Sequence, residues 1–171
     1  MFSIGPIDNP NGTMFMNKLA AALVLATALS VPSLAYAKDL TIEAQIATYR
    51  GPNAFLAIYL TKPDGSYDTT LWVAGQNQRY YRHLRNWVRG ISSAGGNIDG
   101  ISGASVGAGQ TLTIHASVAD AMIDAGYQIH VDSAVENGGE YPNDVVMPLA
   151  QANSGHAAVG TGYVQSLTVT F

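Results

Sequence analysis

One short segment of this chain carries side chains that could do chemistry. Asp99 is followed three residues later by Ser102, and Gly103, Ala104 and Ser105 come next, with further glycines on both sides. Glycine weakens strands and permits positive φ, while Ser and Asp side chains tend to hydrogen-bond nearby backbone in turns. We therefore expect residues 99–105 to form a loop that presents hydroxyl groups. The alternative is a plain surface connector.

The order of residues in this loop resembles a known attachment motif for flavin. The pattern Asp-x-x-Ser/Thr-Gly-Ala-Thr/Ser occurs in the FMN-carrying subunits of sodium-translocating NADH:quinone reductase and of the related Rnf complexes. In those proteins an FMN transferase joins the FMN phosphate to the hydroxyl of the last motif residue. The resemblance implies that Ser105 accepts covalent FMN, that Ser102, Gly103 and Ala104 belong to the same site, and that Asp99 positions the loop or the transferase's metal. The acceptor is commonly threonine, so Ser105 departs from the usual motif.

Other catalytic and metal-binding patterns do not occur around this segment. Ser102 lacks the Gly-x-Ser-x-Gly arrangement of hydrolases, and Gly107 and Gly109 lack the third glycine of a dinucleotide-binding turn. The histidines show neither His-x-His nor His-Glu-x-x-His spacing; they are His83, His115, His130 and His156. The pattern favours a redox carrier over an enzyme with its own substrate pocket, and a histidine-based metal or haem binder is a third hypothesis.

The first part of the chain has the features of an export signal. Lys18 precedes an apolar run over residues 19–34, and the small residues Ala35 and Ala37 flank Tyr36 in the manner of a cleavage site. We expect an upstream extension at 1–15, a signal peptide at 16–37 and one mature domain at 38–171. The alternative is an uncleaved membrane anchor. The sequence therefore predicts a periplasmic protein that does not span the membrane after cleavage.

Composition limits the possible partners of this domain. The chain has no cysteine, which excludes a disulfide framework and a thiolate metal site. Its net charge is −4, and removal of residues 1–37, which contain only Lys18 and Asp8 as charged residues, leaves that value unchanged. An acidic domain is a poor ligand for nucleic acid, so we expect no nucleic-acid partner.

The mature chain shows the short, turn-separated strands of an all-β protein. Seven strands are expected, at 40–46, 54–60, 69–73, 111–116, 127–135, 144–149 and 163–171. Residues 54–60 are almost all apolar, which predicts a strand buried on both faces. Residues 118–125 are ambiguous between a helical turn and an ordered loop, and 151–162 are expected to be a flexible connector. This spacing predicts an immunoglobulin-like antiparallel sandwich of about seven strands.

One amphipathic helix is expected at residues 79–91. Its apolar and aromatic residues share one arc of the helical wheel, and four arginines share another: Arg79, Arg82, Arg85 and Arg89. Guanidinium groups suit phosphate geometry, so Arg82 and Arg85 are candidates to attract the FMN phosphate or an acidic redox partner. The alternative is a solvated helix face. The aromatic residues Trp72, Tyr80, Tyr81 and Trp87 could stack on an isoalloxazine ring or form core.

Beyond the attachment motif, residues 38–171 resemble the domain-of-unknown-function family 2271 of predicted periplasmic proteins. The resemblance rests on residues 80–87, on 99–105, on Ala125-Gly126-Tyr127 and on residues 136–139. It implies a periplasmic β-sandwich associated with flavin transfer and with membrane electron-transfer proteins of iron uptake.

These observations lead to one expected function and one alternative. We expect a periplasmic electron-transfer flavoprotein with FMN covalently attached to Ser105, serving a membrane reductase of iron uptake. Its partners would be an FMN transferase and a membrane-bound electron donor or acceptor. The alternative is an unmodified immunoglobulin-like module for binding or assembly.

Overall fold

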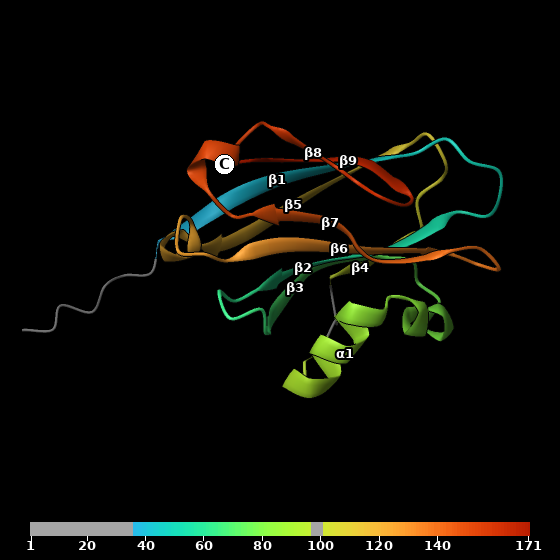
Figure 1. Ribbon diagram of the computed structural model, residues 1–171, viewed down its shortest axis with the longest axis horizontal. Helices are drawn as coiled ribbons and strands as arrows, with labels where there is room; N and C mark the ends of the chain where they lie inside the picture. Colours follow the sequence, from blue (N-terminus) through green and yellow to red (C-terminus); the bar gives the residue numbers. More distant parts are fainter. Residues whose placement is uncertain (1–35, 97–100) are drawn as a thin grey trace, which may run out of the picture. The chain divides into compact units, whose positions relative to one another are not determined.

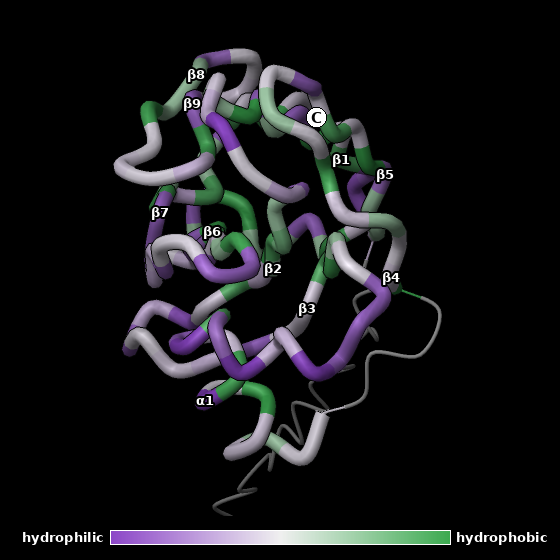
Figure 2. Tube along the Cα trace, turned by 90° about the vertical axis from the view of Figure 1, so that its right-hand side faces the viewer, coloured by the Kyte–Doolittle hydropathy of each residue, from purple (hydrophilic) through white to green (hydrophobic). Residues whose placement is uncertain are grey.

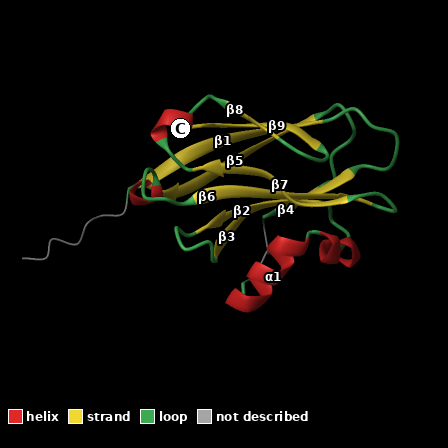
Figure 3. Ribbon diagram, in the orientation of Figure 1, coloured by secondary structure: helices red, strands yellow, loops and turns green. Residues whose placement is uncertain are grey.

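The computed structural model describes residues 36–96 and 101–171, which belong to one compact unit of two strand layers (Figures 1 and 3). The upstream extension, the expected signal peptide up to residue 35 and Asp99 lie outside the described residues. Nine strands occur in the described part: β1 (Ala37–Ile46), β2 (Ala54–Thr61), β3 (Tyr67–Ala74), β4 (Ser102–Gly103), β5 (Thr111–Ala119), β6 (Gln128–Val135), β7 (Glu140–Pro148), β8 (Ala157–Val159) and β9 (Val164–Thr170). The helical segments there are η1 (Gln78–His83), α1 (Arg85–Ala94), η2 (Asp120–Met122) and η3 (Gln151–Asn153).

The strands form two sheets with an immunoglobulin-like arrangement. One sheet has the order β5-β1-β9-β8, and the other has the order β4-β3-β2-β6-β7. The order β3-β2-β6-β7 opposite a β5-β1 pair corresponds to strands C′-C-F-G opposite E-B in immunoglobulin sandwiches. Every strand pair of the described residues is antiparallel except β3 with β4. The predicted all-β sandwich is confirmed.

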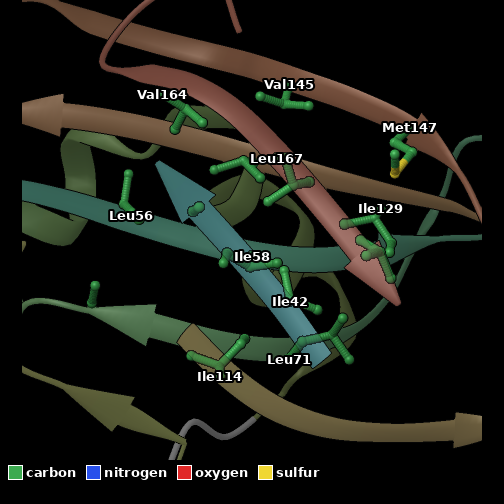
Figure 4. Packing of buried hydrophobic residues seen from close by; sticks show 14 of the residues in the cluster. Ile42, Leu56, Ile58, Leu71, Ile114, Ile129, Val145, Met147, Val164 and Leu167 are labelled. Carbon is green, nitrogen blue, oxygen red and sulfur yellow. The ribbon is translucent and has the colours of Figure 1, made fainter. Parts of the chain in front are cut away.

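The main hydrophobic core lies between the two sheets (Figure 4). Ile42 and Leu167 from one sheet and Ile58 and Ile129 from the other are completely buried there. Burying an aliphatic side chain of this size contributes roughly 1.5–3 kcal/mol, so this layer supplies most of the driving force for folding.

Strand β2 is buried along its whole length, as predicted from its continuous apolar sequence. Leu56 and Ile58 belong to the core between the sheets, whereas Phe55, Ala57 and Tyr59 belong to a second cluster with residues of η1 and α1. Figure 2 shows α1 beside the β2–β3 layer and away from β1 and β9. The helix therefore supplies the second cover that a two-sided apolar strand requires.

The continuous helix expected at 79–91 is wrong. Segments η1 and α1 meet instead at Leu84, whose φ of −89° and ψ of 73° are not helical. The buried carboxylate of Asp132 on β6 accepts hydrogen bonds from the backbone N–H groups of Asn86 (2.8 Å) and Trp87 (2.9 Å). The first N–H groups of a helix lack partners inside it, so Asp132 satisfies these two and fixes where α1 begins.

Two further expectations about the strands need correction. The sandwich has nine strands in its described part and not seven, because β4 and β8 were not expected. Residues 151–162 contain η3 and β8 where a flexible connector was expected. The turn between β8 and β9 is held by Asp144 on β7, whose carboxylate accepts hydrogen bonds from the N–H groups of Thr161 (2.8 Å), Gly162 (2.6 Å) and Val164 (2.9 Å).

The ambiguous segment at 118–125 divides between the end of β5 and the helical turn η2. Within the part of the chain that the structure describes, no helix is both long and apolar enough to cross a bilayer.

Candidate functional site

The attachment motif lies at the β4 edge of its sheet. Ser102 and Gly103 form a two-residue parallel strand beside Val73 and Ala74 of β3, so the expectation that this segment contains no strand is wrong. The N–H of Val73 donates to the carbonyl of Ile101 (2.9 Å), and the N–H of Gly75 donates to that of Gly103 (2.7 Å). The glycine is required here, because a Cβ at position 103 would lie 2.7 Å from Cζ2 of Trp72.

Ser105 lies between two anchored points of the backbone. Gly103 is bonded to β3 on one side of it, and on the other Val106 exchanges two hydrogen bonds with Ala54 at the start of β2 (2.7 and 3.0 Å). Ala104 is exposed and Ser105 is half-buried. The position of Asp99, the remaining motif residue, lies outside the described residues. The acceptor position is therefore tethered on both sides and partly open to solvent.

Trp72 of β3 is the aromatic side chain next to this segment. Its ring is partly buried at the margin of the core between the sheets, and its Nε1 is buried without a hydrogen-bond partner in the described residues. Of the four aromatic residues that the sequence offered for stacking, Trp72 is the one whose ring lies against Gly103 in the described part of the motif. A Trp-to-glycine contact across two strands cannot be read from sequence spacing.

The other three aromatic residues belong to the cluster under α1 and η1. Trp87 is 2% exposed, and its Nε1 donates to Thr70 Oγ1 (2.9 Å), while Tyr81 donates its hydroxyl to the carbonyl of Gly75 (2.7 Å). Tyr80 is half-buried and donates to Glu136. Core packing, and not ring stacking on a cofactor, accounts for Trp87 and Tyr81.

The structure does not bring Arg82 and Arg85, the two arginines expected near the FMN phosphate, to Ser105. Arg85 is paired with Glu140 at the start of β7, and His83 Nδ1 contacts the same carboxylate at 2.6 Å. Arg82 is exposed and donates through Nε to His83 Nε2 at 3.3 Å. Strands β7 and β4 are the two outer strands of this sheet, which puts them about 19 Å apart. The hydrogen bond from His83, and after it Arg85, lowers the pKa of Glu140 below its usual value.

A cleft that the sequence did not reveal lies on the outer face of the same sheet. It has a volume of about 520 Å³ and lies between α1, the β2–β3 turn, and His130 of β6 and Asn143 of β7. Its side chains come from six elements or turns, and the polar and aromatic ones include Tyr59, Thr61, Lys62, Tyr67, Asn86, Arg89, His130 and Asn143. No spacing in the sequence connects these residues, so no pattern could have found them.

The floor of this cleft is a hydrogen-bonded polar network. His130 is bonded through Nδ1 to Asn143 Oδ1 (2.9 Å) and through Nε2 to Thr61 Oγ1 (3.1 Å), and its ring stacks on Tyr59 at 5.4 Å. The Tyr59 hydroxyl donates to the buried Asp132 carboxylate (3.2 Å). Burial and then Asp132 raise the pKa of Tyr59 well above its usual range, so its hydroxyl remains a donor. Lys62 and Arg89 are the charged residues of the described lining.

The remaining histidines do not form a metal site in the described part of the chain. Within residues 36–96 and 101–171, no three histidine or carboxylate side chains come together in a way that could hold a metal ion. His115 contacts Thr41 Oγ1 (3.3 Å) on the outer face of the β5–β1 pair.

Comparison with known proteins supports one family. A family model described as "Predicted periplasmic protein (DUF2271)" matches residues 37–166. No curated protein and no solved structure gives a significant match to the chain.

Proposed function

This chain belongs to the DUF2271 family of predicted periplasmic proteins, and we propose that it is an exported electron-transfer flavoprotein. In this proposal Ser105 carries FMN through a phosphoester bond. An FMN transferase attaches the group, and a membrane-bound donor or acceptor, such as a reductase of iron uptake, exchanges electrons with it. The flavin supplies the redox chemistry when bound. The protein supplies a tether and partial shielding.

The position of Ser105 supports this proposal. A hydroxyl that reacts in another enzyme's active site must be reachable and must not be crowded by its neighbours. Ser105 is half-buried, next to the exposed Ala104, and its backbone is held by β3 on one side and by Ala54 on the other. The segment is therefore partly open to solvent at Ala104 and Ser105, and the anchors limit how far a group attached there can move.

The attachment step requires an activated donor. A flavin dinucleotide meets this need, because its pyrophosphate bond breaks as Ser105 Oγ forms a bond to the phosphorus of the FMN half. The hydroxyl proton passes to a base of the transferase, and the nucleoside monophosphate leaves. The proposal does not need Arg85, which is paired with Glu140 at the opposite edge of the sheet.

Co-expression with an FMN transferase tests the proposal. The intact mass should rise by one FMN unit, and Ser105→Ala should abolish this gain. Ser92→Ala is the matched control, because Ser92 is an exposed serine outside the motif, and it should retain the FMN. An unmodified wild-type protein, under conditions where the transferase modifies a known substrate, would contradict the proposal.

The cleft favours a second candidate function, which is the binding of a small planar anion by an unmodified module. Lys62 and Arg89 supply positive charge, while Tyr59, Tyr67 and His130 supply flat surfaces. Pockets of about 300–1,000 Å³ with a few convergent polar groups are typical of small-molecule sites. The cleft lies near Thr61, at the opposite end of β2 from Ala54 and the motif, about 23 Å away. The two candidate sites can therefore be tested separately.

Benzoate is a suitable probe for the cleft. We expect it to perturb the NMR signals of His130 and Tyr67, and Arg89→Gln should weaken binding by about tenfold because it removes a charge-assisted contact. Arg79→Gln is the control, since Arg79 is an exposed arginine outside the lining. The absence of any perturbation, or an equal loss with Arg79→Gln, would reject this function.

A further inference from the structure

We infer that two copies of this protein associate through strand β5, by antiparallel pairing of the two β5 edges. The inference is independent of FMN and of the cleft. It rests on the shape of the sheet edges, on the direction of the backbone groups of β5 and on the symmetry of its sequence.

The outer strands of the two sheets are β5 and β8 in one and β4 and β7 in the other. Strand β4 has two residues and β8 has three, and β7 contains Pro142 and Pro148. Short strands and prolines are the usual protection of sheet edges. Strand β5 has nine residues, of sequence TLTIHASVA, without proline, lysine or any acidic residue. Among the described residues β5 pairs only with β1.

The fold explains why this edge is open. In an immunoglobulin sandwich of the order A-B-E-D, strand D covers the outer edge of strand E. Strand β5 occupies the place of E, but the chain between β3 and β5 forms η1, α1 and β4 at the other sheet. In the described part of the chain, no strand therefore takes the place of D.

The register with β1 shows which backbone groups face outward. At one end of the pair the N–H of Ile46 donates to the carbonyl of Gln110 (2.8 Å), and at the other the N–H of Asp120 donates to that of Tyr36 (2.7 Å). Backbone groups alternate in direction along a strand. The even-numbered residues of β5 therefore face β1, and the N–H and C=O groups of Thr113, His115 and Ser117 face away from it.

A second copy matches this edge. Antiparallel pairing centred on His115, the middle residue, places Thr113 of one copy opposite Ser117 of the other, so that hydroxyl side chains meet in both outer pairs. The exposed acidic residues Asp39 and Glu43 lie on β1. In the paired sheet the two β1 strands are about 14 Å apart, which exceeds a Debye length at physiological salt. Charge repulsion therefore does not oppose the contact.

A proline substitution tests the pairing directly. His115→Pro removes an outward N–H and no backbone hydrogen bond to β1, so the fold should persist, as prolines are tolerated on edge strands. It also removes the side-chain contact of His115 with Thr41 Oγ1 (3.3 Å) on β1, which His115→Ala removes as well. His115→Ala keeps the N–H and is the matched control. A single strand edge buries little area, so we expect association on the order of micromolar affinity or weaker.

In sedimentation velocity from about 1 to 500 µM protein, wild type and His115→Ala should move toward the dimer mass. His115→Pro should remain monomeric, with an unchanged far-UV spectrum. Hydrogen exchange at the amides of Thr113 and Ser117 should slow with rising concentration in wild type and in His115→Ala, but not in His115→Pro. A wild type that stays monomeric throughout, or a His115→Pro variant that dimerises equally, would overturn the inference. If His115→Pro does not fold, the Thr113→Lys variant is measured in its place and should remain monomeric, because a lysine on an edge strand opposes pairing.

Discussion

At the scale of single residues, this protein depends on a few positions whose importance comes from tertiary contacts. Gly103 is one, since the Trp72 ring occupies the space that its side chain would need. Asp132 is another: it is completely buried, and it accepts hydrogen bonds from Asn86, Trp87, Tyr59 and Asn143. Burying a carboxylate costs free energy unless hydrogen-bond donors surround it. Each of these donors therefore helps to offset the cost of burying Asp132.

Removing the Asp132 carboxylate should be strongly destabilising. Asp132→Ala leaves the buried N–H of Trp87 and the partly buried N–H groups of Asn86 and Asn143 without their acceptor, and we expect a loss of about 3 kcal/mol or more in the free energy of unfolding. Asp39→Ala is the control, because it removes an exposed carboxylate. Urea denaturation of both variants measures the difference. Equal stability of the two would show that Asp132 does not fix α1.

Gly103 should tolerate no side chain. Gly103→Ala forces either β4 or Trp72 to move, and an overpacked position of this kind typically costs about 1–3 kcal/mol. Trp72 fluorescence should change as well, because the contact involves its indole ring. Ala104→Ser, at the exposed next position, should leave both the stability and the fluorescence unchanged. An identical response of the two variants would argue against the packing described.

At the scale of elements, the β7 edge and the helical segments are joined by a partly exposed charged cluster. Glu140 accepts hydrogen bonds from His83 and Arg85, and its pKa is lowered. A carboxyl group with a lowered folded-state pKa adds stability above its unfolded pKa, which is about 4.3. This contribution is lost as the pH falls through the folded value.

The melting temperature of wild type should therefore fall more steeply below about pH 4.3 than that of Glu140→Gln. The difference between the two proteins should be largest near neutral pH and should disappear in acid. It should be small throughout, because water reaches the cluster and screens its charges. Thermal melts from neutral to acidic pH measure it, and parallel curves for the two proteins would contradict the assignment.

The elements also show how much the sequence could predict. The longer strands, such as β1 and β5, were predicted because apolar and polar residues alternate along them, and β2 was predicted because it is continuously apolar. Strands β4 and β8 were missed because two or three residues carry no periodicity. The break at Leu84 was missed because its cause, Asp132, lies 45 or more residues away in the chain.

The candidate site was predicted only in part, for the same reason. Ser102, Gly103, Ala104 and Ser105 are contiguous, so the order of residues alone is enough to recognise their motif. The partner of Gly103, Trp72, and the pairing of Arg85 with Glu140 are set by strand order. Strand order depends on packing between segments that are distant in the chain, and the spacing of residues in the sequence does not reveal that packing.

At the scale of the whole molecule, the two faces of the β4-β3-β2-β6-β7 sheet contact different parts of the protein. Its inner face builds the core with β1 and β9, and its outer face carries η1, α1 and the cleft. The attachment motif lies at the β4 edge, about 19 Å from the β7 edge where Arg85 is paired. The proposed flavin would thus lie beside β3 and Trp72, away from Arg85.

Modification at Ser105 is the central claim, and peptide mapping tests it most directly. The protein is purified from the periplasm of a host that also expresses an FMN transferase, digested, and its fragments are sequenced by tandem mass spectrometry. We predict that FMN is found on the peptide containing residues 101–106 and that the fragment ions place it on Ser105. FMN on Ser102, or a fully unmodified peptide from cells in which the transferase is active, would contradict the claim.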